Sequence, residues 1–188
     1  MSALGGGPVA DLITPGQKII EAAGEWIIYT AGGVNQNQSF PYGLGEQFTV
    51  GAGQSITVSG MGLYVNNGAA TNGTATVKVW NMATSTEVAG LTVTFGAGPY
   101  DLVAGDYRAI YVTPVVLGAG TYNVSGAGNA DNYNTNNGTP GLVSFNTLGG
   151  KLTWVGSFYS GGGTVPPTAA FGAPPGPLAF GLVTLLAK

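Results

Sequence analysis

The chain has 188 residues, with 34 Gly, 11 Pro, no Cys and no His, and five Lys and Arg against eight Asp and Glu give a formal net charge of −3. This length fits one domain, and the Gly and Pro content disfavours long helices. Without Cys and His the chain cannot form disulfides, Cys/His zinc sites or His-dependent nucleophiles. The few cations are scattered, which excludes the basic surface that nucleic acids need.

Residues 1–25 are predicted to form an N-terminal arm. Thr14-Pro15-Gly16-Gln17 is a capping-box pattern with Pro at the first helical position, which favours a short helix running towards Ala23. Two strands, over residues 18–21 and 26–30, are an equally good interpretation. Residues 1–10 lack the basic segment of a secretory signal, and no apolar run reaches the length of a membrane span. We therefore expect a protein made in the cytoplasm without a signal peptide and without a membrane partner.

Residues 26–160 are predicted to form the folded domain. Ile56 and Val58 alternate with polar residues, and the alternation then shifts by one to Met61 and Leu63, so a β-bulge or a corner is expected near Gly60. Further short strands are predicted over residues 74–80, 91–95, 107–116, 121–124, 142–146 and 151–158, with a turn over 117–120 and Pro114 at an edge or bulge. Such regular short strands predict an all-β fold, a jelly-roll-like antiparallel β-sandwich with extended N- and C-terminal arms.

Residues 161–188 are predicted to be a Gly/Pro-rich spacer followed by an apolar strand. Two interpretations are open for this strand, because it can close its own sheet or dock onto a neighbouring subunit. The residues expected to bind a partner through this arm are Leu178, Phe180, Leu182, Leu185 and Leu186.

Several turn and strand segments follow one another in a recognisable order. They read YGLGEQFTV at 42–50, ITV at 56–58, GLY at 62–64, VKVW at 77–80 and PVVLGAGTY at 114–122. In order and spacing they resemble a β-sandwich domain of secreted bacterial proteins, many of which carry the PEP-CTERM sorting signal. The resemblance covers about residues 42–130 and implies a fold, but no settled function and no catalytic residues. The chain shows neither the signal peptide nor the sorting tail of that family, which points away from the cell envelope.

Acidic side chains are the remaining candidates for catalysis or metal binding. Asp101 and Asp106 flank one predicted turn, where Asp commonly caps the backbone. The loop 128–138 offers oxygen ligands to calcium, but a single carboxylate is little charge for a divalent ion, and side-chain to backbone hydrogen bonds explain the loop better. Its candidate ligands are Asn129, Asp131, Asn132 and Asn134. We therefore predict no enzyme activity, no cofactor and no metal.

The function predicted from the sequence is structural. A charge-poor β-sandwich with apolar arms is typical of a bacteriophage virion, most simply a capsid decoration or cement protein. Its expected partners are copies of itself, as a trimer, and the major capsid or another virion protein. The alternative is a glycan-binding module that contacts sugars through Trp80 and Tyr133. Other aromatic residues that could stack on sugars, although such residues are more often core, are Tyr100, Trp154, Phe158 and Tyr159.

Overall fold

The computed structural model describes residues 24–30, 36–37, 43–64, 74–96, 101–103, 107–127, 133–134, 143–171 and 182–188. Every regular element in these ranges is a β-strand, so the all-β prediction is confirmed. The strands are β1 (Glu25–Trp26), β2 (Ile28–Thr30), β3 (Gln36–Asn37), β4 (Gly43–Tyr64), β5 (Ala75–Asn81), β6 (Thr86–Phe95), β7 (Asp101–Val103), β8 (Tyr107–Ala127), β9 (Tyr133–Asn134), β10 (Val143–Phe145), β11 (Leu152–Ser160), β12 (Ala169–Ala170) and β13 (Val183–Ala187). The predicted helix over residues 14–23 lies outside the described residues.

One nine-stranded antiparallel sheet contains most of the strands. Its order is β1-β13-β4-β8-β5-β6, with β11 also paired to β4, β12 to β11 and β7 to β8. Two small sheets, β10-β2 and β3-β9, complete the structure. Among the described residues, no helix is long and apolar enough to cross a membrane.

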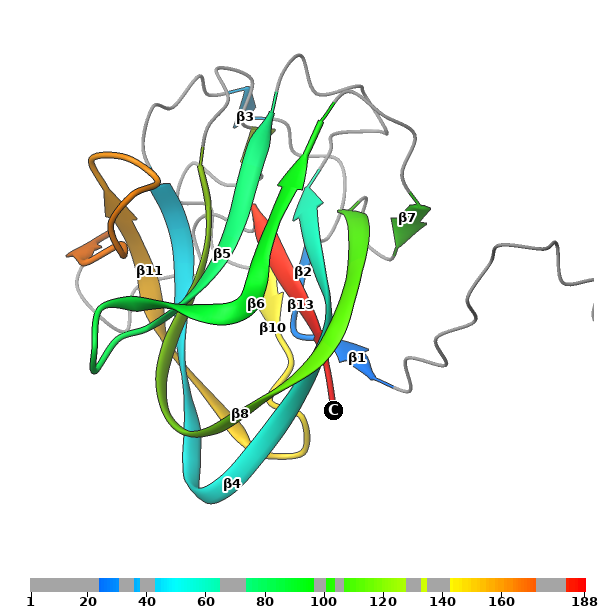
Figure 1. Ribbon diagram of the computed structural model, residues 1–188, viewed down its shortest axis with the longest axis vertical. Coiled ribbons are helices and arrows are strands. Elements are labelled where there is room, and N and C mark those ends of the chain that lie inside the picture. Colours follow the sequence, from blue (N-terminus) through cyan, green and yellow to red (C-terminus); the bar gives the residue numbers. More distant parts are fainter. Residues whose placement is uncertain are drawn as a thin grey trace, which may run out of the picture.

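The two longest strands, β4 and β8, give the sheet its shape. They pair from Leu44↔Gly126 to Tyr64↔Tyr107, and the register shifts between Val50 and Ser55 and again between Val58 and Gly60. Figure 1 shows β4 turning sharply at the lower end of the molecule and β8 curving broadly beside it, so each strand contributes to two facing halves. The sheet thus folds over itself as a sandwich, and the jelly-roll connectivity stays a prediction.

The bulge predicted near Gly60 is confirmed by the second register shift. Pro114 lies in the stretch of β8 between Tyr111 and Val115 where that shift falls, as expected for a residue that lacks a backbone N–H. The turn predicted over residues 117–120 is wrong, because β8 continues through them without interruption. Opposite these residues, β4 bends sharply between Val50 and Ser55. Gly53, in this bend, has a φ of 71°, which favours glycine.

The core lies between the two halves of the folded sheet. The alternating residues that the sequence placed on one face are buried, including Ile56 and Val58 before the bulge and Met61 and Leu63 after it. The core side chains of β5, β6 and β8 are Ala75, Val77, Val79, Leu91, Val93, Phe95, Leu117, Tyr122 and Val124. The burial of Ile56, Val58, Met61 and Leu63 confirms the alternation that was predicted for them.

The C-terminal strand β13 lies between β1 and β4, within the chain's own sheet (Figure 1). Leu182, Leu185 and Leu186 are 1%, 0% and 5% exposed. This corrects the expectation that these three residues reach a neighbouring subunit, because they fill the edge that β4 would otherwise leave unpaired. Leu178 and Phe180, the other two residues expected on the arm, lie outside the described residues.

Candidate functional site

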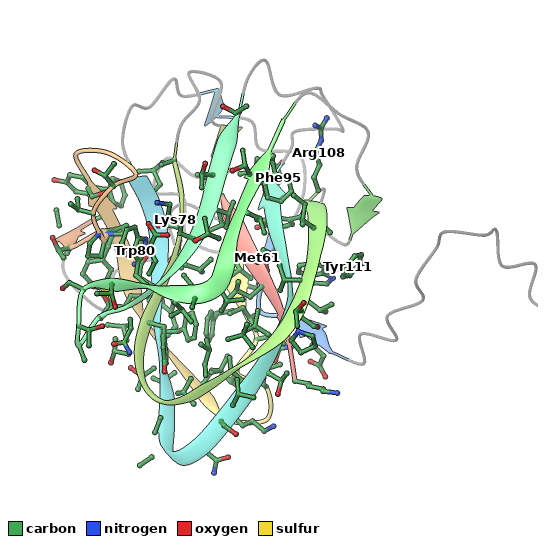
Figure 2. The ribbon with its side chains drawn as sticks, in the orientation of Figure 1. Met61, Lys78, Trp80, Phe95, Arg108 and Tyr111 are labelled. Atoms are coloured by element: carbon green, nitrogen blue, oxygen red, sulfur yellow. The ribbon has the colours of Figure 1, made fainter. Side chains whose placement is uncertain are left out.

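Trp80, expected to be an exposed sugar platform, is buried. It points away from the core, since Val77 and Val79 face inward, but it is only 3% exposed. Its indole Nε1–H donates to Ser125 Oγ at 2.9 Å on the neighbouring strand β8. The Lys78 ammonium lies 5.3 Å from the ring centroid and covers it (Figure 2). The predicted glycan contact at Trp80 is therefore closed in this structure, and the side chain of Tyr133 lies outside the described part of the chain.

An ion pair holds Lys78 over this ring. Its Nζ lies 2.5 Å from Glu87 Oε1 on strand β6, and Thr92 Oγ1 donates to Glu87 Oε2 at 3.0 Å. The hydrogen bond from Lys78 is the main reason that the pKa of Glu87 lies below its usual value. Because both charges are engaged with each other, this part of the sheet presents a nearly neutral, threonine-rich surface.

Asn123 is a buried amide without a hydrogen bond. The side chain is 0% exposed, and neither Nδ2 nor Oδ1 has a partner. Asn123 is paired with Trp80 on one side and with Gln47 on the other. It is closely packed against Gly45, where an added Cβ would collide with Asn123 Oδ1 and lie 2.5 Å from Val124 O. A buried amide without hydrogen bonds costs stability, so Asn123 makes the fold less stable than an apolar side chain of the same shape would.

Glu46 is a fully buried carboxylate on the inner side of β4. Trp154 Nε1 and Ser157 Oγ, both on β11, donate to its Oε2 at 3.0 and 2.7 Å. Burial, followed by the Glu46 charge and Tyr64, raises the pKa of Tyr107 well above its usual value. Trp154, one of the aromatic residues considered for sugar stacking, is therefore used to satisfy a buried charge.

Exposed apolar side chains gather on the hairpin formed by β11 and β12. Tyr159, Val165 and Phe171 are 37%, 51% and 37% exposed. Tyr159 pairs with Ala169, and the Phe171 N–H donates to Ser157 O at 2.8 Å, which extends the pairing by one step. Tyr159 and Phe171 therefore lie on the same face of the sheet as Ser157. Ser157 pairs with the buried Glu46, so this is the face that covers the core. We call these three exposed residues the edge strip.

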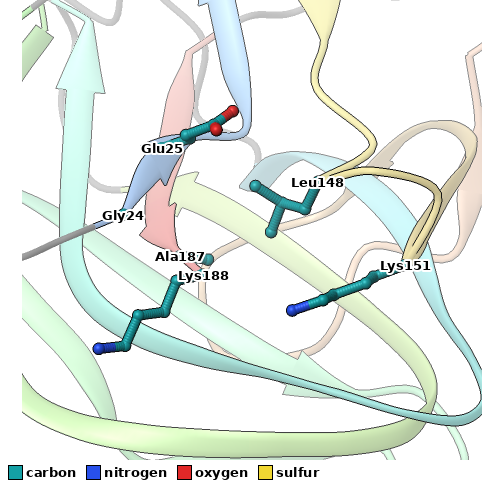
Figure 3. Close-up of a pocket in the computed structure, with 6 residues that line it drawn as sticks. All are labelled: Gly24, Glu25, Leu148, Lys151, Ala187 and Lys188. Carbon is teal, nitrogen blue, oxygen red and sulfur yellow. The ribbon is translucent and has the colours of Figure 1, made fainter.

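An open pocket lies at another edge of the sheet, beside β1 and β13. It has a volume of about 430 Å³ and is lined by Gly24, Glu25, Leu148, Lys151, Ala187 and Lys188. Figure 3 shows Glu25 on one side of this pocket and the two lysines on the other. The pocket combines charged groups of both signs with the apolar side chains of Leu148 and Ala187, a combination that suits a small polar ligand.

The other candidate residues are not assembled into a catalytic or metal site in the part of the chain that the structure describes. The described residues contain no group of three or more acidic side chains that could hold a metal ion. The side chains of Asp101 and Asp106 and those of the asparagine-rich loop lie outside that part.

No family model matches the chain, and neither the curated proteins nor the solved structures contain a match. The function must therefore be inferred from the chain itself.

Sequence reasoning missed the pocket. Its residues come from positions 24–25, 148–151 and 187–188, which no local pattern connects. The one available signal was the run Thr147-Leu148-Gly149-Gly150-Lys151, where a glycine turn precedes one of the five cations. Such a turn is ordinarily only a connection between strands.

Proposed function

We propose that the protein is a structural component of a bacteriophage virion, a decoration protein that binds the outer surface of the capsid. The observation that carries this proposal is the edge strip, Tyr159, Val165 and Phe171, exposed at the β12 edge of the sheet. Tyr159 and Phe171 continue the face that bears Ser157, which reaches inward to Glu46. A shell subunit placed against this edge would extend the core of the sandwich.

The size of the edge strip supports binding on a shell better than a stable free oligomer. Specific protein interfaces usually bury about 800 Å² on each partner, which takes about 20–30 residues a side. Three exposed side chains fall well short of that. A decoration protein gains the missing affinity when copies bound at adjacent sites also contact one another, because each such contact forms between partners that the shell already holds close together. The predicted trimer would accordingly form on the capsid.

The experiment tests particles rather than the free chain. Phage particles made without the gene are incubated with the purified protein, sedimented and analysed for bound protein. The wild type is expected to sediment with the particles, and a Y159S/F171S variant is expected to stay in the supernatant. Tyr111, which is 42% exposed and lies on the other side of the molecule in Figure 2, provides the matched control Y111S. Wild-type protein that never sediments with particles would contradict the proposal.

A glycan-binding module is the second candidate, and the pocket beside β1 and β13 favours it. The platform expected at Trp80 is covered by Lys78, so a glycan would need another site. The pocket provides charged and apolar groups within one volume of about 430 Å³, inside the usual range for small ligands.

A further inference from the structure

Four residues form one row across the outer face of the sheet, where β1, β13, β4 and β8 follow one another. Trp26 pairs with Leu186, which pairs with Gly60. Gly60 pairs in turn with Tyr111. Residues directly opposite one another in paired strands point to the same face. Leu185, next to Leu186, belongs to the core, so the row faces away from the core.

The two aromatic rings of this row reach the backbone of β4 at two glycines. A Cβ added to Gly60 would lie 3.4 Å from Cδ1 of Tyr111, and a Cβ added to Gly62 would lie 3.4 Å from Cζ3 of Trp26. The two glycines are two residues apart on one strand, so these contact points are separated by about 6–7 Å. The rings therefore approach one another over β4, Trp26 from the side of β1 and Tyr111 from the side of β8.

Both rings are accessible to solvent, whereas the side chains beside them are buried. Tyr111 is 42% exposed and Trp26 is partly exposed. Leu186 and Thr184 on β13 are both buried. Figure 2 shows Tyr111 on the opposite side of the molecule from Trp80, the aromatic residue that Lys78 covers. We call Trp26 and Tyr111 the aromatic platform.

The same face continues along β4 and β8 with one hydroxyl and one apolar side chain. Ile56 and Val58 face the core, so Thr57 between them faces outward. Thr57 pairs with Val116, which is 65% exposed. Aromatic and apolar groups with a few polar groups are the usual lining of a ligand site.

The size of this surface favours a narrow ligand over a protein. A specific protein interface takes about 20–30 residues a side, far more than two rings and their neighbours supply. Two rings about 6–7 Å apart at the backbone match successive rings of an extended sugar chain.

We propose that the aromatic platform binds a glycan chain of pyranose rings with equatorial hydroxyls, as in β-1,4-linked glucose. Equatorial hydroxyls leave the axial C–H groups as an apolar face, which can stack on an aromatic ring. One sugar would lie on Tyr111 and another on Trp26, and a longer chain would continue over Val116 and the hydroxyl of Thr57. This inference adds a site to the glycan-binding candidate. It depends neither on the pocket, whose lining includes none of these residues, nor on the virion role.

Nuclear magnetic resonance titration of the ¹⁵N-labelled full chain with cellohexaose tests the proposal. Cellohexaose is expected to shift the indole N–H signal of Trp26 and the amide signals of residues 60–62 and 111. The indole N–H signals of Trp80 and Trp154 should not move, because both groups are hydrogen-bonded to other side chains of the protein. Maltohexaose, whose α-1,4 linkages curve the chain, should bind at least tenfold more weakly. Y111S should raise the Kd for cellohexaose by about tenfold or more, because a sugar loses its stacking partner.

Y159S is the matched control, because Tyr159 is 37% exposed but belongs to the edge strip. It should leave cellohexaose binding unchanged, and the spectrum of each variant reports whether the fold is intact. The proposal is overturned by the absence of any shift up to the solubility limit of cellohexaose, by equally tight binding of maltohexaose, or by unchanged binding to Y111S. A dimer in solution that Y111S converts to a monomer would make the platform a protein interface and would also overturn it. The particle experiment is independent, since there Y159S/F171S is expected to lose binding and Y111S to keep it.

Discussion

The C-terminal strand offers the sharpest test of the fold. Leu185 is 0% exposed and belongs to the core, and its strand β13 pairs with β4. Leu185→Ala removes buried methyl groups and leaves a cavity, which costs about 2–5 kcal/mol in comparable cores. With about 3 kcal/mol as the central value, the melting temperature of a chain of this size should fall by about 6–12 °C. The oligomeric state in solution should not change.

Thermal unfolding followed by circular dichroism measures the stability, and light scattering measures the mass. Val116→Ala is the control, because Val116 is 65% exposed, and this change should alter the stability by no more than about 0.5 kcal/mol. If Leu185→Ala left the melting temperature unchanged and instead reduced the mass of the assembly, β13 would belong to a neighbouring subunit in solution. The intramolecular position of the strand would then be refuted.

Three further predictions concern strands β4, β5, β6 and β8. Gly45→Ala should lower the free energy of unfolding, measured with denaturant, by at least about 2 kcal/mol, because the added Cβ lies 2.5 Å from Val124 O. Gly118→Ala is the control and should change the stability little, because no atom lies within 4 Å of the Cβ added there. Asn123→Leu should raise the melting temperature, since it removes two unsatisfied buried polar atoms, and a fall would show that the amide has an unseen partner. Glu87→Gln should lower stability at neutral pH but not in acid. The pKa of Glu87 is below its usual 4.5 in the folded chain, so its contribution is complete above that value and is lost as the pH falls through the lowered pKa. Urea titrations at about pH 7 and about pH 3 measure the free energy of unfolding of the wild type and of Glu87→Gln. The same difference between the two proteins at both pH values would contradict the stabilising role of the Glu87 charge.

The alternation of side chains predicted the strands and their inward faces well. Ile56, Val58, Met61 and Leu63 face the core as expected, because the side chains of a strand alternate strictly between its two faces and a bulge shifts that alternation by one residue. The burial of Trp80 was not predicted, because Lys78 covers the ring and Ser125 accepts its N–H, and those contacts arise only after the strands pair.

The destination of the C-terminal strand could not be decided from the sequence. A strand that closes its own sheet and a strand that docks on a neighbour form the same backbone hydrogen bonds and bury the same leucines. Only the position of β4 beside β13 separates the two alternatives. The pocket was unpredictable for a similar reason, since Glu25, Lys151 and Lys188 become neighbours only when β1, β13 and the turn before β11 are in place.

The folded-over pair of β4 and β8 has a consequence for how the protein reaches its native state. Because both strands run through both halves of the sandwich, neither half can form alone, and unfolding is expected to be a single cooperative transition. The pairing joins distant positions, such as Thr49 and Thr121, whose hydroxyls lie 3.2 Å apart. Such non-local contacts make folding slow. During synthesis, β4 keeps part of its edge open until residues 183–187 leave the ribosome, so the nascent chain stays prone to aggregate up to that point.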